Sequence, residues 1–413
     1  MQRKWWVLVA VSLMFFFISG STFSSLGVAL FWMKQDLHWT QTEAGASFSV
    51  LGLACCLSSL LPMAMINRIG SRWTLMFGGF MLAAGFLVAY LAQGLAVFLV
   101  ATALLGIGFS LTANIPGVYL LARWFPERSG RIIGVYLMIG ASGGVVGPPL
   151  AQAVIAGGDW RSLWMMLTIV AALLAFVCLV LIRDDAKVDP SAPVLPTVAA
   201  VAEGWRYRDA VLTPQFALLA LAMVITETCV TVLHSAGVIH FAKLGMPAEF
   251  AALMLSMQAF MATAAKGLSG WLGDWIDPKL LLTVGLLLQG AGMILLGVAD
   301  THALSYAFAV AFGIGWGTAY LTITILLINY FGPNTGSAVM SLVWLLTALA
   351  ALGPAGAGML ADRFGSFTPF FVTSGIVLLP IALAALLMKR PVARASLVQN
   401  AESIAAMPTI ISA

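Results

Sequence analysis

Long apolar runs separated by short polar segments divide almost the whole chain, and this pattern constrains the fold more than any other feature. A helix needs about 20 apolar residues to cross the hydrocarbon core of a bilayer. Because the runs are continuously apolar, without the alternation typical of barrel strands, the sequence predicts an all-α membrane protein. We expect twelve transmembrane helices, at residues 5–33, 43–66, 73–92, 95–122, 131–156, 161–182, 213–242, 248–273, 280–299, 303–330, 336–361 and 367–388.

The composition agrees with a lipid environment. Apolar residues make up 61% of the chain and charged residues 9%, with a mean hydropathy of +1.01, whereas soluble domains devote about a quarter of their residues to charge. The first 20 residues could also be a signal peptide, with a basic start and an apolar core. Eleven further runs and the lack of a clear cleavage site favour a retained first helix.

The distribution of lysine and arginine predicts the orientation in the membrane. If the N-terminus is cytoplasmic, 15 of the 20 basic residues lie in cytoplasmic segments, four lie outside, and Lys266 lies within a run. Cytoplasmic loops carry the excess of positive charge in membrane proteins. We therefore expect a multi-pass protein of the plasma membrane, namely the bacterial inner membrane, with both termini in the cytoplasm. The net charge of +4 reflects this bias rather than a nucleic-acid surface.

The two halves of the chain repeat each other. At an offset of 207, glycines pair across four helices: Gly78 with Gly285, Gly85 with Gly292, Gly106 with Gly313, and Gly108 with Gly315. We assign one six-helix half to residues 1–182, a cytoplasmic linker to 183–212, the second half to 213–388 and a cytoplasmic tail to 389–413. Since six is an even number, both copies run in the same direction, which is an architecture of transporters with a site between the halves.

Two polar segments resemble a motif of a known superfamily. "GWLGDWIDPK", residues 270–279, and its repeat "MAMINRIGSR", residues 63–72, are similar to the G-x-x-x-D-[RK]-x-G-[RK]-[RK] motif of major facilitator superfamily transporters. The resemblance implies the major facilitator fold, with two pseudo-symmetric halves of six helices. It also implies gating residues at Asp274, Arg72 and Lys279, which would close the cytoplasmic side. Alternatively, these charges only anchor the helix ends.

Three further segments narrow the resemblance. "RWFPERSG" at 123–130, "AKGLSGWLGD" at 265–274 and "WGTAY" at 316–320 are similar to the oxalate/formate antiporter and monocarboxylate transporter group. In that group, a cation at the position of Lys266 holds the substrate carboxylate, and aromatic residues at the positions of Trp316 and Tyr320 line the cavity. The resemblance therefore implies a secondary active transporter and not an enzyme.

Lys266 is unusual on physical grounds as well. A charged lysine inside a membrane helix costs about 2.5–3.5 kcal/mol, so we expect it to face a wet cavity or a partner. Ala262, Ala265, Gly267 and Gly270 surround it, and such small residues favour close packing against other helices rather than lipid. Alternatively, the side chain extends to the nearby cytoplasmic end of its helix, about 10 Å away.

Glu227 is the acid placed deepest in an apolar run. It could carry a proton, pair with Lys266, or bond a neighbouring helix. Many proton-coupled members of the group carry an aspartate one turn before the cation, where this chain has Ala262, so we expect Glu227 or the substrate itself to carry the proton. His234 and His240, further along the same run, are either structural residues or proton relays.

Other candidate substrate-binding residues rest on their position in the apolar runs. They could equally well be polar residues that hold helices together. They are Asn114, Tyr136, Ser142 and Trp344. The four cysteines, Cys55, Cys56, Cys178 and Cys229, all lie in apolar runs, so we expect no disulfide, metal or cofactor.

The number of positive charges limits the substrate. Oxalate-exchanging members of the group pair the cation with a second lysine, whereas the run 336–361 contains none and has Leu345 or Leu346 at that place. A single cation predicts a small monocarboxylate, similar to lactate or pyruvate, moved together with a proton by a monomer. The alternatives are carboxylate exchange of the oxalate/formate type and transport of another solute, such as a drug or a sugar. A receptor or a membrane enzyme would need an output domain or a catalytic cluster that the runs do not supply.

Overall fold

The computed structural model describes residues 2–182, 205–273 and 275–391, which form helices and short turns. The first half contains α1 (Gln2–Ser19), the π-helix η1 (Gly20–Ser24), α2 (Ser25–Asp36), α3 (Gln41–Leu57), α4 (Leu61–Ile69), α5 (Ser71–Tyr90), α6 (Leu95–Thr112), α7 (Asn114–Trp124), η2 (Pro126–Arg128), α8 (Ser129–Ala156) and α9 (Trp160–Leu181). The second half contains α10 (Tyr207–Val211), α11 (Pro214–Lys243), α12 (Ala248–Leu272), α13 (Pro278–Gly297), α14 (His302–Phe331), α15 (Pro333–Leu346), η3 (Thr347–Leu352), α16 (Gly353–Phe364) and α17 (Thr368–Leu387).

The expected all-α membrane fold is confirmed. Among the described residues, eleven helical segments are long and apolar enough to cross a membrane. The pair α3 and α4, bent by 48° at a short break, is long and apolar enough only when taken together, and makes twelve spans if it is counted as one. Several of the runs predicted as single helices thus consist of two or three consecutive shorter helices.

Helix bounds repeat at the offset that the glycines predict. α5 covers residues 71–90 and α13 covers 278–297, and both differ by 207 at each end. The continuous α14 covers 302–331, while its counterparts α6 and α7 together cover 95–124. The two halves therefore share one helical framework.

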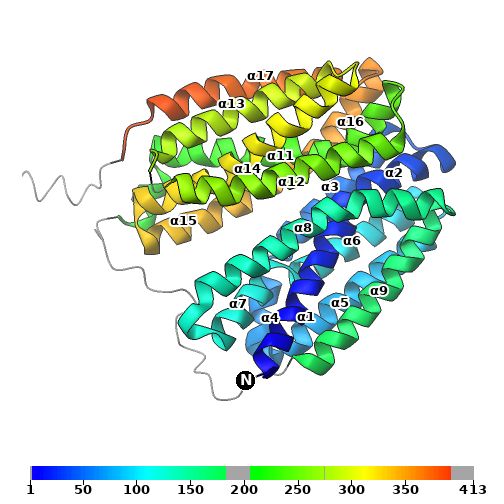
Figure 1. Ribbon diagram of the computed structural model, residues 1–413, viewed down its shortest axis with the longest axis horizontal. Helices are drawn as coiled ribbons and strands as arrows, with labels where there is room; N and C mark the ends of the chain where they lie inside the picture. The colour runs from blue at the N-terminus through cyan, green and yellow to red at the C-terminus, as the bar shows by residue number, and fades with distance from the viewer. Residues whose placement is uncertain (1, 183–204, 274, 392–413) are drawn as a thin grey trace, which may run out of the picture.

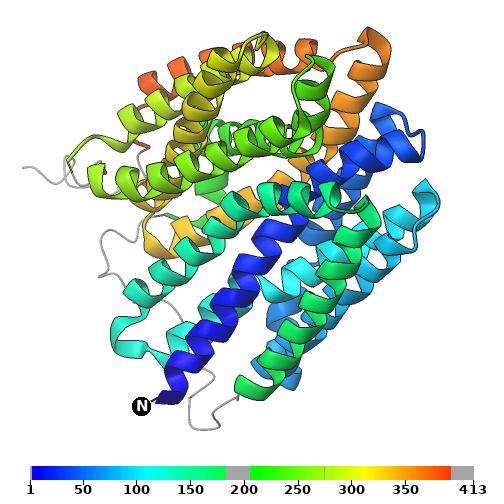
Figure 2. The same ribbon diagram turned by 45° about the vertical axis from the view of Figure 1, so that its right-hand side comes forward.

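The two six-helix halves lie side by side (Figure 1 and Figure 2). We call one end of the bundle the termini end, since it holds the start of α1 and the end of α17, and the other the distal end, which holds the turns that follow α2, α8 and α16. In Figure 1 the ribbons of the two halves approach each other around α2, α3 and α16 and diverge toward α7 and α15. The hydrogen bonds that α16 makes with α3 of the other half lie in this region.

Proline explains where several spans break. Pro116, Pro62 and Pro354 lie in the first turns of α7, α4 and α16, where each follows an interruption. A proline has no N–H to donate and its ring clashes with the carbonyl four residues earlier, so a helix is interrupted before it. Pro148 and Pro149 lie inside α8 without ending it.

Hydroxyl side chains stabilise the π-helix in the first span. Thr22 Oγ1 donates to the Ile18 carbonyl at 2.6 Å and Ser25 Oγ donates to the Gly20 carbonyl at 2.5 Å. A π-turn lengthens the hydrogen-bonded loop by one residue and leaves carbonyls that need other donors. Thr22 and Ser25 supply such donors within the apolar span.

Candidate substrate-binding site

Lys266 lies in α12 with its ammonium group against two aromatic rings of α14. Its Nζ is 4.0 Å from the centroid of the Trp316 ring and 4.4 Å from that of the Tyr320 ring. The side chain is half-buried, and neither of the two ion pairs between described residues involves it. Contacts of a cation with ring faces contribute about 0.5–2 kcal/mol each and leave the donors of the ammonium group free to bind an anion.

Close packing of α12 against α14 explains how the lysine reaches these rings. A Cβ on Gly313 would lie 2.5 Å from the carbonyl oxygen of Gln258, and one on Gly317 would lie 2.3 Å from that of Ala262. Such distances are too short for any side chain, so only glycine permits this approach. Lys266, one turn after Ala262, therefore meets Trp316 and Tyr320 beside these glycines.

Glu227 of α11 approaches the same tryptophan from another side. Trp316 Nε1 donates to Glu227 Oε1 at 3.0 Å, and the half-buried acid does not come within ion-pair distance of Lys266. One indole thus offers its face to a cation and its N–H to a carboxylate. Both groups therefore contact the same indole without forming an ion pair. The ammonium group is thus not neutralised by direct contact with the acid.

We call Lys266, Glu227, Trp316 and Tyr320 the group around Lys266. Trp344, Thr347 and Cys56 extend this group, and the last two were not predicted as site residues from the sequence. The Trp344 ring lies 5.4 Å from the Tyr320 ring, and Thr347 Oγ1 donates to the Trp344 carbonyl at 2.6 Å. The Cys56 thiol of α3 interacts with Thr347 and lies close enough to Glu227 to interact electrostatically. Cys56 is therefore a contribution of the first half to a group otherwise made by the second.

The structure places the other candidate lining residues differently. Tyr136 was expected to line the cavity, but it is fully buried, stacks on Phe15 and donates its hydroxyl to the Ala113 carbonyl at 3.1 Å. The same carbonyl also accepts a hydrogen bond from the Gly117 N–H at 3.4 Å in the first turn of α7, so the Tyr136 hydroxyl is bonded at the helix break and its role in substrate binding stays a prediction. Ser142 donates to the Ile139 carbonyl of its own helix at 2.7 Å. Asn114 begins α7, and its side chain lies outside the described part of the structure.

The predicted gating residues have partners within their own halves. Arg72 Nε donates to the Leu179 carbonyl at 2.7 Å, and Lys279 Nζ lies 3.7 Å from Asp277 Oδ2. Asp274, the acid of the motif, lies outside the described residues. A latch between these residues stays a prediction.

The surroundings of Lys266 agree with the expected close packing only in part. Ala262 and Ala265 are buried, whereas Gly267 and Gly270 are exposed. A Cβ on Gly267 would meet nothing within 4 Å. A Cβ on Gly270 would instead lie 3.5 Å from the Leu321 side chain of α14, so Gly270 borders the packed face that carries the alanines, whereas Gly267 does not.

The two histidines of α11 differ in their contacts. His240 is buried, and its Nε2 lies 2.9 Å from the Leu296 carbonyl, which is a structural contact within the second half. His234 is half-buried beside the Gln258 side chain. Neither histidine touches the group around Lys266 in any contact that the structure records.

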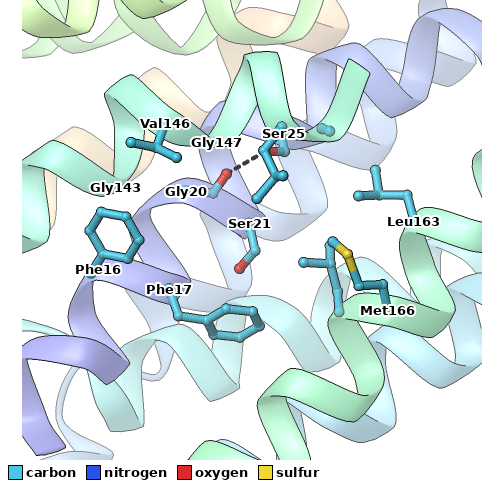
Figure 3. A pocket seen from close by; sticks show the side chains of 13 residues that line it. Phe16, Phe17, Gly20, Ser21, Ser25, Gly143, Val146, Gly147, Leu163 and Met166 are labelled. Atoms are coloured by element: carbon cyan, nitrogen blue, oxygen red, sulfur yellow. Dashed lines mark hydrogen bonds between the residues drawn. The ribbon is translucent and has the colours of Figure 1, made fainter. Parts of the chain in front are cut away.

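A small cavity of about 60 Å³ lies elsewhere, between the first span, α8 and α9 (Figure 3). Its lining is apolar apart from serine hydroxyls, and Phe17, Val146 and Met166 contribute to it. The buried hydroxyl of Ser21 has no hydrogen-bond partner among the described residues. None of the lining residues belongs to the group around Lys266, so this cavity is separate from the candidate site.

The described residues provide no cluster of three or more His, Cys, Asp or Glu side chains that could hold a metal ion. The group around Lys266 is instead defined by charge and aromatic contacts. It combines one accessible cation, aromatic walls and one nearby acid.

The chain belongs to the Major Facilitator Superfamily, whose family model matches residues 11–352. The protein is therefore a membrane transporter and not an enzyme.

Within the superfamily, curated relatives share similarity over most of the chain. Monocarboxylate transporter 11 of Homo sapiens is 27% identical over 388 residues, which cover 91% of this chain and 80% of the relative. Monocarboxylate transporter 13 of Rattus norvegicus is 26% identical and covers 78% of this chain and 74% of the relative. The resemblance to the monocarboxylate transporter group is thus confirmed.

Solved structures show the same fold. The nucleoside transporter NupG superimposes with a TM-score of 0.76 at 12% identity, covering 92% of this chain and 99% of that one. A bacterial homologue of the human lysosomal transporter Spinster, in an inward-facing and unoccupied conformation, gives a TM-score of 0.74 at 15% identity and covers 94% and 95%.

Proposed function

We propose that the protein transports a small monocarboxylate, similar to lactate or pyruvate, together with a proton by alternating access. The observation that carries this proposal is the ammonium group of Lys266, which rests on Trp316 and Tyr320 without an acid at ion-pair distance among the described residues. Two opposite charges 4 Å apart attract each other by about 4 kcal/mol at an effective dielectric constant of 20. The similarity to monocarboxylate transporters supports the same assignment.

The absence of a second cation in the eleventh span supports a substrate with one carboxylate. Leu345 is 57% exposed and precedes Leu346, and Trp344 stands beside the aromatic group. A second carboxylate in these surroundings would lose its hydration without gaining a partner, at a cost of several kcal/mol. An alkyl group there would instead gain about 0.8 kcal/mol per buried methylene.

Glu227 is the proposed proton carrier. It is the acid that touches the aromatic group, and its bond to Trp316 Nε1 connects its protonation state to the ring that also holds Lys266. A bound carboxylate would add a negative charge near Glu227 and would thereby favour uptake of a proton. Binding of substrate and proton are then coupled by reciprocal linkage.

Counterflow in proteoliposomes tests the proposal directly. Proteoliposomes that contain the purified protein are loaded with unlabelled solute. Uptake of labelled lactate, pyruvate or acetate is then compared with uptake of labelled oxalate, succinate, glucose and a cationic drug. We expect exchange of the monocarboxylates and weak competition by oxalate. Preferred exchange of oxalate would favour the antiporter alternative, and exchange of glucose or the drug alone would overturn the carboxylate assignment.

A gain-of-function variant sharpens the test of substrate charge. Leu345→Lys would place a second cation on the exposed face of α15, within the span where exchangers of the dianion carry theirs. We expect oxalate to compete with labelled lactate in this variant at least about tenfold better than in the parent protein, since a paired carboxylate recovers its desolvation cost. Leu345→Gln, which adds polarity without charge, is the control and should leave oxalate a poor competitor.

The bias of basic residues further supports a cytoplasmic location of both termini. The termini end of the bundle is then the cytoplasmic end, and the distal end faces outward. Labelling of single cysteines placed in distal loops, such as Gln93→Cys, by an impermeant reagent on intact cells tests this orientation. Labelling only after the membrane is opened would reverse it.

A further inference from the structure

Asp362, near the distal end of α16, accepts three hydrogen bonds from the other half of the molecule. The backbone N–H of Gln41 donates to its Oδ1 at 2.9 Å, and the backbone N–H of Thr42 donates to its Oδ2 at 2.9 Å. The Thr42 hydroxyl donates to the same Oδ2 at 2.6 Å. One carboxylate of the second half is thus held by the first turn of α3 in the first half.

The donors on α3 are fixed before the carboxylate arrives. Thr40 and Glu43 form a reciprocal capping box, in which Glu43 N donates to Thr40 Oγ1 at 3.1 Å and Thr40 N donates to Glu43 Oε2 at 2.8 Å. The N–H groups of the first turn point out of the helix and favour a negative charge. Because the capping box leaves the N–H groups of Gln41 and Thr42 free, Asp362 completes this helix terminus from the opposite half.

The contact continues along α3 as a packed seam. Ser49 Oγ accepts a hydrogen bond from Ala355 N at 3.1 Å, and a Cβ on Gly52 would lie 2.8 Å from Ala351 Cβ. One turn further toward the termini end, Cys56 interacts with Thr347. Beyond this point Leu57 is 78% exposed. The seam therefore runs from Asp362 to the edge of the candidate site and stops there.

A second seam, between α8 and α12, has a smaller polar contact of the same kind. Gln152 Nε2 donates to Glu249 Oε1 at 3.1 Å, while Gln152 Oε1 accepts from Trp32 Nε1 at 3.1 Å. In both seams the carboxylate belongs to the second half and the donors belong to the first. Glu249 accepts one bond from a neutral amide, whereas Asp362 accepts three and completes a helix terminus, so Asp362 is the stronger contact.

We propose that Asp362 is the latch that keeps the distal end of the transporter closed, and that its carboxylate sets the equilibrium between the closed and open forms of that end. Opening of the distal end separates α3 from α16 and must break all three bonds together. Lys34 of the first half and Lys243 of the second both interact electrostatically with Asp362, so the latch carries its compensating charge in either form. The latch acts on transport whatever solute is carried.

Distances between spin labels test the latch without knowledge of the substrate. Labels are attached at Gln93→Cys and Asp300→Cys, exposed positions of distal turns in the first and second half, in a background without the four native cysteines. We expect Asp362→Asn to raise the ratio of the open to the closed distance population about tenfold or more, because hydrogen bonds to a charged group are stronger than neutral ones. Asp36→Asn is the matched control, since Asp36 bonds Trp160 and Arg161 within the first half.

Two milder variants remove single bonds of the latch and are expected to keep the fold. Thr42→Val removes the hydroxyl donor, and Gln41→Pro removes one backbone donor at the first position of α3, where proline is well tolerated. Each should shift the distance ratio in the same direction as Asp362→Asn but by less, about two- to fivefold. Thr42→Val added to Asp362→Asn should give less than the sum of the two effects, because both act on one contact.

Unchanged distance populations in Asp362→Asn and in both milder variants would overturn the proposal. An equal shift in Asp36→Asn would overturn it as well, since the effect would then follow from surface charge alone. If Asp362→Asn does not fold, a shift in Thr42→Val and Gln41→Pro supports the latch, and the absence of a shift in both refutes it.

Discussion

The two halves of the molecule share one helical framework but carry different contents. In the second half, Lys266, Glu227, Trp316 and Tyr320 form one connected group on α12, α11 and α14. The first half holds no charged residue at the corresponding places. At the offset of 207 the counterparts are, in the same order, Ser59, Gly20, Phe109 and Ala113.

Three of these four counterparts fall at breaks in the backbone. Gly20 begins the π-helix η1, Ser59 lies in the turn between α3 and α4, and Ala113 separates α6 from α7. In the second half α11, α12 and α14 cross the same places as continuous helices of 30, 25 and 30 residues. The comparison shows that continuous helices carry Lys266, Glu227, Trp316 and Tyr320, whereas the corresponding places of the first half fall mostly at breaks.

The largest expected effect tests whether recognition belongs to the second half alone. Lys266→Gln should weaken binding of labelled lactate or pyruvate about a thousandfold, because about 4 kcal/mol of charge attraction is lost. Lys266→Arg should retain part of the binding. Equilibrium binding to purified protein measures the effect, and Ser59→Ala, at the counterpart position, is the control that should change affinity less than twofold. Unchanged affinity in Lys266→Gln would contradict the proposal that the second half recognises the carboxylate through Lys266.

The second prediction tests whether Glu227, also in the second half, carries the coupled proton. Glu227→Gln should retain counterflow, which needs no net movement of protons, but should lose accumulation driven by an inward pH gradient. Uptake of labelled substrate into proteoliposomes, with and without the gradient, measures both. Accumulation that survives in this variant would assign the proton to the substrate or to another group.

The third prediction compares the loss of affinity on replacing Trp316 with that on replacing its counterpart in the first half, Phe109. Trp316→Phe removes the N–H that bonds Glu227 and weakens the contact of the ring face with Lys266, so affinity should fall about tenfold. Phe109→Leu, at the counterpart position in α6, removes a ring that packs edge-on against Phe23 and should alter affinity less than twofold. Equal losses in both variants would show that the first half takes part in recognition.

The smallest effect concerns the stability of the first half at its π-helix, where the second half has a continuous helix. Ser21→Ala removes a buried hydroxyl without a partner among the described residues and should raise the free energy of unfolding by up to about 1 kcal/mol. Thr22→Ala removes a hydroxyl bonded to Ile18 and should lower it by a similar amount. Thermal unfolding in detergent compares the two variants. A loss of stability in Ser21→Ala equal to that in Thr22→Ala would mean that Ser21 has a partner in solution.

The framework could be predicted from the sequence because hydropathy and repeated glycines report it directly. The twelve apolar runs correspond to the observed spans, and the offset of 207 returns in the bounds of α5 and α13. The breaks were not predicted, although Pro62, Pro116 and Pro354 mark three of them. A run of 20 apolar residues satisfies the hydropathy pattern whether or not it is interrupted, so proline has to be weighed separately.

The candidate site could be predicted only where a residue is unusual on its own. Lys266 and Glu227 are conspicuous because they are charges within apolar runs. Their link through Trp316, the role of Cys56 and the bonds of Asp362 depend on contacts between helices that lie far apart in the sequence. Tyr136 shows why position alone is a weak signal, since a hydroxyl group within a span can bond a backbone carbonyl as readily as it binds a substrate.

The π-helix of the first span has a consequence for the register of everything that follows it. A π-turn absorbs one additional residue, so α2 is out of phase by one position with an uninterrupted α-helix begun at α1. Gly27 of α2 fits against α11 so tightly that a Cβ there would lie 1.7 Å from the His234 carbonyl oxygen. If η1 rewound into a regular α-helix, Leu26 would rotate into that place and could not fit. The additional residue of the π-helix therefore determines that a glycine, and not the leucine before it, meets the opposite half.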